Sequence, residues 1–106
     1  MNRGPEPPPM KSNIIQIDDF KFSLGQLVAT TNAAAQIPSD EMAKAIKRHV
    51  SGDWGDLCDE DVATNEYGLR NRGRLMSVYQ AETKIPFWIV TEGDRSVTTV
   101  LLPEDY

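Results

Sequence analysis

"RLMSVYQAETKIPFWIVTEGDRSVTTVLLP", residues 74–103, decides the fold of this chain. Its apolar residues alternate with polar ones or form short runs, a pattern typical of β-strands. Turn-forming residues at 82–84 and 92–96 divide the stretch into three segments, and Pro103 closes the last one. Loops this short join antiparallel neighbours, so the stretch predicts a meander of three strands.

Two helices are predicted upstream of the meander. The first begins at Ser39, has apolar residues at spacings of three and four, and stops at Gly52. The second begins at Asp59, which we expect to cap it, and ends within 71–73. Gly68 inside this second helix costs it about 1 kcal/mol relative to alanine.

A further strand is predicted before the helices, between Ile14 and Thr30, with a break at Gly25 and a short helical turn after it at 33–35. The order strand, helix, helix, strand, strand, strand predicts an α+β fold: an antiparallel sheet with two helices packed on one face. Residues 1–13 contain four prolines, which predicts a disordered tail. Residues 14–106 are then expected to form a single α+β domain.

The charge of the chain is negative and unevenly distributed. The net charge is −5, and residues 53–106 carry eleven acids against five bases. A nucleic-acid-binding protein usually needs a basic surface, so nucleic acid is an unlikely partner. No apolar run approaches the roughly 18 residues that cross a bilayer, so no membrane contact is expected. A single cysteine, Cys58, agrees with a reducing compartment, and we expect a cytoplasmic location.

One histidine and a few charged residues suggest a nuclease. His49 would act as acid or base, with Asp53 orienting its imidazole if the first helix continued that far. Glu92 would serve as a base, and Arg74 and Arg95 would hold a phosphate. The competing interpretation makes His49 a cation at a helix C-terminus and places Glu92 and Arg95 in a solvated hairpin.

The acidic stretch between the predicted helices does not predict a metal site. Its aspartates do not have the spacing of an EF-hand, and zinc would need more than one Cys and one His. We therefore expect no metal and no cofactor. Trp54 stands between Gly52 and Gly55, which predicts either a plug between the two helices or an exposed interface anchor.

Four segments carry a family resemblance: "FSLGQLVAT" (22–30), "RHVSGDWGD" (48–56), "GRLMSVY" (73–79) and "FWIVTEGDRSVTTVLLPEDY" (87–106). They resemble a family of small uncharacterised bacterial proteins from plasmids and phages, often labelled "plasmid-related protein". The resemblance covers roughly residues 22–106 and implies a mobile-element setting, with no catalytic residue to carry over. The Pro-rich leader and Thr31-Asn32 depart from the family pattern. The predicted topology alone also resembles RelE-like toxins and barnase-like nucleases.

These observations lead to three hypotheses on function. The first is a small acidic mobile-element protein that acts by binding a host or defence protein, possible binding residues being Trp54 and the acids Asp56, Asp59, Glu60 and Asp61. The second is a RelE-like or barnase-like ribonuclease or toxin that uses His49, Arg74, Glu92 and Arg95. The third is a structural homodimer that pairs exposed strand edges.

Overall fold

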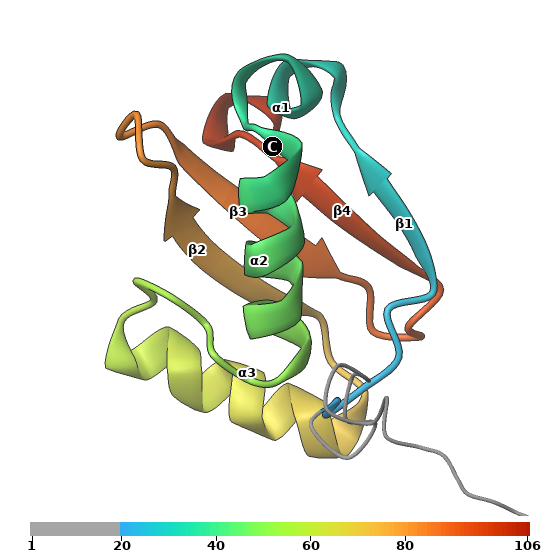
Figure 1. Cartoon of the computed structure of the whole chain (residues 1–106). Helices are drawn as coiled ribbons and strands as arrows, with labels where there is room; N and C mark the ends of the chain where they lie inside the picture. The colour runs from blue at the N-terminus through green and yellow to red at the C-terminus, as the bar shows by residue number, and fades with distance from the viewer. Residues whose placement is uncertain (1–19) are drawn as a thin grey trace, which may run out of the picture.

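A four-stranded sheet organises the computed structural model, which describes residues 20–106 (Figure 1). The strands are β1 (Gln26–Ala29), β2 (Leu75–Gln80), β3 (Pro86–Thr91) and β4 (Val97–Leu101). Their order in the sheet is β1-β4-β3-β2. The predicted tail at residues 1–13, and the first residues of the expected strand, lie outside the described residues.

The meander is confirmed, because β2 pairs antiparallel with β3 and β3 pairs antiparallel with β4. The predicted all-antiparallel sheet is wrong at one strand, since β1 pairs parallel with β4 from Gln26↔Val97 to Ala29↔Val100. The chain leaves β1 through the helices and re-enters the sheet at its far edge, so the meander ends with β4 beside β1 and running in the same direction. The α+β class therefore holds, with a mixed sheet.

Three α-helices and a short C-terminal 3-10 helix connect and follow the strands. They are α1 (Thr31–Gln36), α2 (Ser39–Val50), α3 (Asp59–Asn71) and η3 (Pro103–Asp105). The residues before α1, α2 and α3 occupy the cap positions, so Ser39 and Asp59 are first helical residues and not caps. Among the α-helices of residues 20–106, only α1 has a side-chain cap, in which the Thr30 hydroxyl accepts from the amide of Ala33 at 3.1 Å.

The core lies between α2 and one face of the sheet. Helix α2 has a well-defined apolar stripe and buries Ala45, His49 and Val50. The strands contribute the large buried side chains of this layer, including Tyr79, Phe87, Ile89 and Val100. Burial of this apolar surface is the main stabilising term of the fold.

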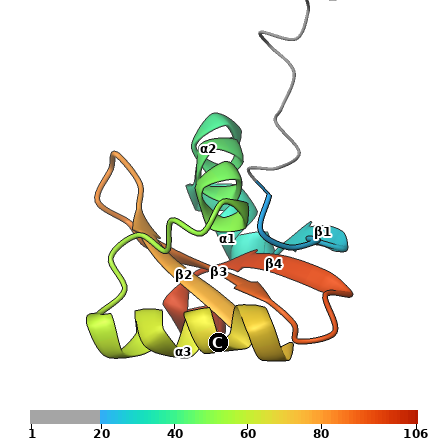
Figure 2. The same ribbon diagram turned by 90° about the horizontal axis from the view of Figure 1, so that it is seen from below.

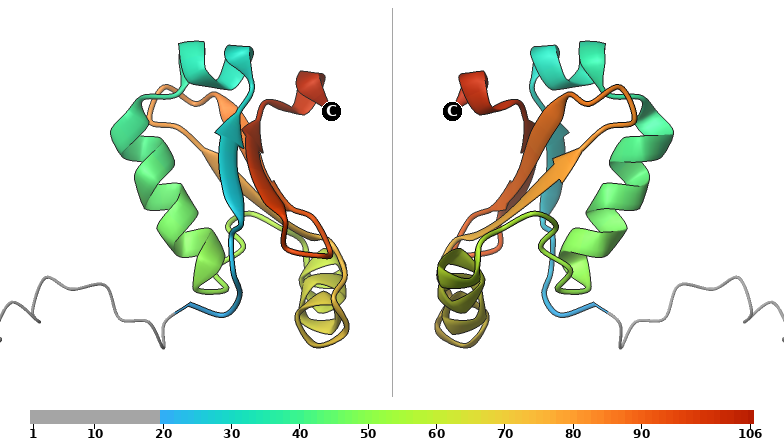
Figure 3. Two further views of the ribbon diagram at one scale, coloured as in Figure 1. Left: turned by 90° about the vertical axis from the view of Figure 1, so that its right-hand side faces the viewer. Right: turned by 90° about the vertical axis from the view of Figure 1, so that its left-hand side faces the viewer.

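Helix α3 does not join α2 on that face, so the prediction of two helices on one face is wrong. Figures 2 and 3 show α2 and α3 on opposite sides of the sheet. The reason lies in what α3 buries, which is Asn65 and Gly68 instead of an apolar stripe. A helix without an apolar face cannot cover a hydrophobic sheet face, and α3 docks by polar contacts along the edge strand β2.

The outer edge of β2 is closed by these polar contacts. The Asn65 amide donates to the carbonyl oxygen of Met76 at 2.7 Å and accepts from its N–H at 3.1 Å. Farther along the strand, the N–H of Val78 donates to the carbonyl of Trp54 at 3.1 Å, and its carbonyl accepts from Asp56 N–H at 2.7 Å. The backbone of Gly55 passes so close to β2 that a Cβ atom at this position would lie 2.0 Å from the carbonyl oxygen of Val78. A paired edge of this kind cannot add a further strand at these positions.

Candidate functional site

The acidic residues that the sequence singled out lie on the surface around the start of α3. We define the acidic surface as Asp56, Asp59, Glu60, Asp61 and Tyr67. All five side chains are exposed, and three of the acids form the first turn of α3. Negative charge there is favourable against the helix dipole, so these residues stabilise the helix as well as shape the surface.

Tyr67 is the residue of this surface that the sequence analysis missed. Its side chain is 62% exposed, which makes it one of the large apolar side chains that the fold leaves on the surface. It lies seven residues after Glu60, which is two helical turns or roughly 10 Å along the same side of α3. Helical periodicity could have found it, because positions 65 and 68 face the sheet edge and position 67 therefore faces away.

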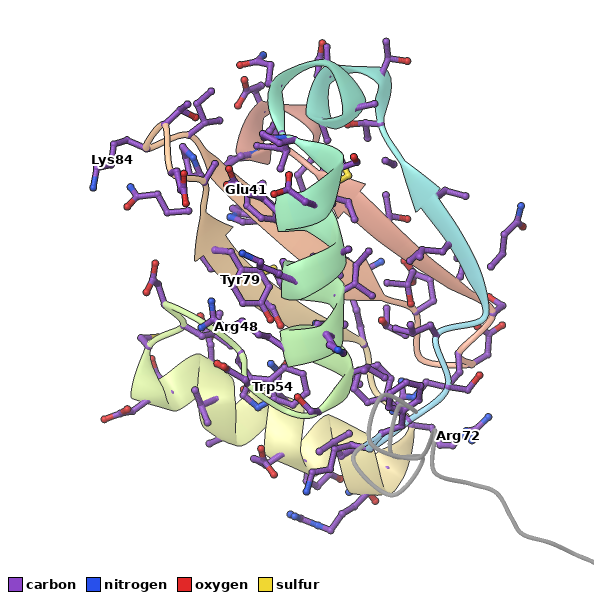
Figure 4. The ribbon with its side chains drawn as sticks, viewed as in Figure 1. Glu41, Arg48, Trp54, Arg72, Tyr79 and Lys84 are labelled. Atoms are coloured by element: carbon purple, nitrogen blue, oxygen red, sulfur yellow. The ribbon has the colours of Figure 1, made fainter. Side chains whose placement is uncertain are left out.

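Trp54 lies inside the protein, with 4% of its surface exposed. Its indole N–H donates to Glu66 of α3 at 3.0 Å, and its ring meets His49 of α2 edge-on at 5.6 Å between centroids. Figure 4 shows the side chain between the end of α2 and α3. Of the two alternatives weighed for Trp54, this position corresponds to a plug between the helices, so Trp54 supports the acidic surface from below.

His49 is fully buried and joined to a chain of hydroxyl groups. Its Nδ1 lies 2.5 Å from Ser77 Oγ, and its Nε2 lies 2.9 Å from Thr91 Oγ1. Thr91 Oγ1 lies 2.7 Å from Thr98 Oγ1, which donates to the carbonyl of Leu24 at 2.7 Å. Every polar atom of the imidazole therefore has a partner.

The direction of each hydrogen bond follows from counting protons. The single proton of Thr98 goes to the Leu24 carbonyl, so Thr91 must donate to Thr98. With its proton used, Thr91 can only accept from His49 Nε2–H. Burial lowers the pKa of His49 to about 4, so the imidazole is neutral at pH 7 and its unprotonated Nδ1 accepts from Ser77.

Asp53 does not orient His49 as expected. Helix α2 ends at Val50, and Gly52 adopts a φ of +88° that turns the chain away. The Asp53 carboxylate accepts instead from Arg48 at 2.8 Å, which holds the pKa of Asp53 below its usual range. Arg48 also lies over the ring of Tyr79, 4.7 Å from its centroid (Figure 4).

Among the nuclease candidates, only Arg74 and Glu92 come together. Their side chains pair at 3.3 Å, and Arg74 also donates to the Tyr106 hydroxyl at 2.6 Å. Thr91 faces α2 and His49, so Glu92, the next residue of the chain, points to the other side of the sheet. The four residues therefore do not share one cleft.

Arg95 is used to attach the β3–β4 turn to the end of α3. Its guanidinium donates to the carbonyls of Gly68 at 2.9 Å and Gly73 at 2.7 Å. It also donates to two carbonyls of its own turn, those of Glu92 and Gly93. These bonds satisfy carbonyl groups at a helix C-terminus and give Arg95 a structural role at this turn.

Over residues 20–106, no group of three or more His, Cys, Asp or Glu side chains is arranged to hold a metal ion. The same part of the chain contains no helix that is both long and apolar enough to cross a membrane. Comparisons with models of known protein families, with curated proteins and with solved structures give no match.

Proposed function

We propose that this protein acts by binding another protein, and that the acidic surface makes the contact. The observation that carries the proposal is Tyr67, a large aromatic side chain left 62% exposed on the same outer side of α3 as Glu60. Tyrosines at the centre of interfaces often contribute much of the binding energy, because they bury a large area with few rotatable bonds. The surrounding carboxylates favour a basic partner.

The charge of the surface suits fast and selective association. Acids around the start of α3 give this end of the molecule a negative field, which steers a basic partner and repels nucleic acid. Exposed charges are screened over about 8 Å at physiological ionic strength, so this contribution to the association rate will fall with added salt.

The biological setting is also a proposal. The resemblance of residues 22–106 to plasmid-related proteins supports an origin in a mobile element, and the partner would then be a host or defence protein in the cytoplasm. The nuclease hypothesis gains less from the geometry, since His49 is buried and Arg74 and Glu92 lie on the other side of the sheet.

Removing Tyr67 or the acids should weaken the complex. We expect Tyr67→Ala to weaken binding by about 10- to 100-fold, the range of an interface hot spot. The triple variant Asp59→Asn, Glu60→Gln, Asp61→Asn should slow association and reduce its dependence on salt. The measurement is affinity capture of partners from a bacterial host lysate, followed by binding kinetics with the captured protein at two salt concentrations.

The control removes the same charge elsewhere. Asp40→Asn, Glu82→Gln and Glu104→Gln neutralise three exposed acids outside the acidic surface. None of these three side chains takes part in the ion pairs found in residues 20–106. If the control triple weakens the complex as much as the α3 triple does, or if Tyr67→Ala leaves it unchanged, the acidic surface is not the interface.

A further inference from the structure

A groove lined by apolar side chains lies between β1 and α2, on the side of the molecule away from the acidic surface. Two large apolar side chains stay exposed there, Phe20 at 39% and Leu27 at 47%. The lining residues are Phe20, Leu24, Leu27, Ala43, Ile46 and Val50, with Lys44 and Lys47 beside them. Exposed apolar side chains that line a groove and are flanked by charged ones are a feature of binding grooves.

The backbone of β1 offers hydrogen-bonding groups along the same groove. Gln26 and Thr30 donate to the carbonyls of Ser96 and Val100, both at 2.9 Å, so alternate residues of the strand face β4. The groups of Leu27 and Ala29 therefore point outward and have no backbone partner in residues 20–106. An extended segment could pair with these groups and place alternate side chains in the groove.

The positive charge of Lys44 and Lys47 beside the groove favours an occupant that carries acidic side chains. Lys44 and Lys47 form no ion pair in the part of the chain that the structure describes. An occupant that fits this groove therefore has apolar side chains for the lining and acidic side chains for the two lysines. A second copy pairing through its own Gln26–Ala29 would bring no carboxylate on that strand.

We propose that residues 14–19 of the same chain, "IIQIDD", bind in this groove, with the segment antiparallel to β1. In an extended segment Ile15, Ile17 and Asp19 fall on one side, where the isoleucines can cover Leu27 and Asp19 can supply charge for the lysines. Asp19 is bonded to Phe20, which itself lines the groove. The amide of Lys21 donates to the carbonyl of Val50, the last residue of α2, at 2.7 Å. Residue 19 therefore enters the groove near the C-terminal end of α2.

The reach of the segment and its attachment both favour this occupant. Six extended residues span at most roughly 20 Å, more than the four residues of β1 require. A tethered segment also binds at a high effective concentration, so modest contacts suffice. The groove is then a place where the chain's own segment and an external strand with similar side chains would compete.

The test is solution NMR of the full-length protein with labelled methyl groups. We expect contacts from the Ile15 and Ile17 methyls to Leu24 and Leu27, within a particle of monomer mass. We also expect the Leu27 and Ala29 amides to exchange at least about tenfold more slowly than in an Ile15→Asp, Ile17→Asp variant. The variant changes no residue of 20–106, and the amide exchange pattern of β2, β3 and β4 will check that the core is intact.

The matched control is Ile14→Asp with Gln16→Asp, which changes the other side of the segment and should keep the methyl contacts. Absence of those contacts in the wild-type protein, with fast exchange at Leu27 and Ala29, would overturn the proposal. Contacts seen only between molecules, together with a doubled mass, would also overturn it and would assign the groove to a second copy.

Discussion

Acidification from pH 7 to pH 4 will cost the protein about 3 kcal/mol of folding stability through His49 alone. Burial lowers the pKa of His49 from 6.5 to about 4. Between these two values the unfolded chain binds a proton that the folded protein does not. The contribution is therefore complete above pH 6.5 and is lost as the pH falls towards 4. Urea unfolding followed by tryptophan fluorescence at several pH values will measure it.

His49→Gln provides the control, because His49 is the only histidine of the chain. The variant will be less stable at pH 7, since glutamine cannot reproduce the ring contacts with Phe22 and Trp54. Its stability should nevertheless change little between pH 6.5 and pH 5. In the wild-type protein a flat profile over the same interval would contradict the buried neutral imidazole.

Replacing Asn65 with alanine will destabilise the fold by about 2 to 4 kcal/mol, the cost of two lost hydrogen bonds and two backbone groups left without partners. The Asn65 side chain is 3% exposed and pairs with both the N–H and the carbonyl of Met76. Denaturant unfolding gives the change in free energy, and hydrogen exchange at Met76 will show whether the edge of β2 opens first.

Asn71→Ala is the matched control on the same helix. Asn71 is exposed and donates only to the carbonyl of Tyr67, four residues earlier. Water can replace that bond, so we expect a change within about 0.5 kcal/mol. Equal losses in the two variants would contradict the assignment of the effect to the closed edge, because alanine has the higher helix propensity at both positions.

The sequence predicted the elements of this fold better than their arrangement. Alternating residues predicted the meander, and the apolar stripe and Gly52 predicted α2, because both signals are local. The side of the sheet that α3 takes was mispredicted, since α3 docks through Asn65, a polar residue that apolar patterns ignore. The parallel pairing of β1 depends on contacts about 70 residues apart, which no local pattern contains.

The same limit applies to the candidate sites. Gly52 and Gly55 on either side of the indole predicted two alternatives for Trp54, a plug between the helices or an exposed interface anchor, and only its burial in the fold distinguishes them. The hydrogen-bond network around His49 could not be predicted from the sequence. Serine and threonine are common in strands, and only the strand register places Ser77, Thr91 and Thr98 next to one another. Tyr67 was missed for a different reason: its exposure becomes significant only once the inward side of α3 is known.

The closed edge of β2 sets an upper limit on self-association. A sheet that grows by adding strands needs an open edge on both sides to form a filament. Asn65 and the Trp54–Asp56 backbone occupy the β2 side, so copies of this domain can meet edge to edge only through β1. Pairing through β1 uses the open sheet edge of both molecules, so assembly by strand addition ends at a dimer. Loss of the Asn65 amide would free only the backbone groups of Met76, and the Trp54–Asp56 backbone would still occupy those of Val78, so opening the edge to filament growth requires that both contacts be lost.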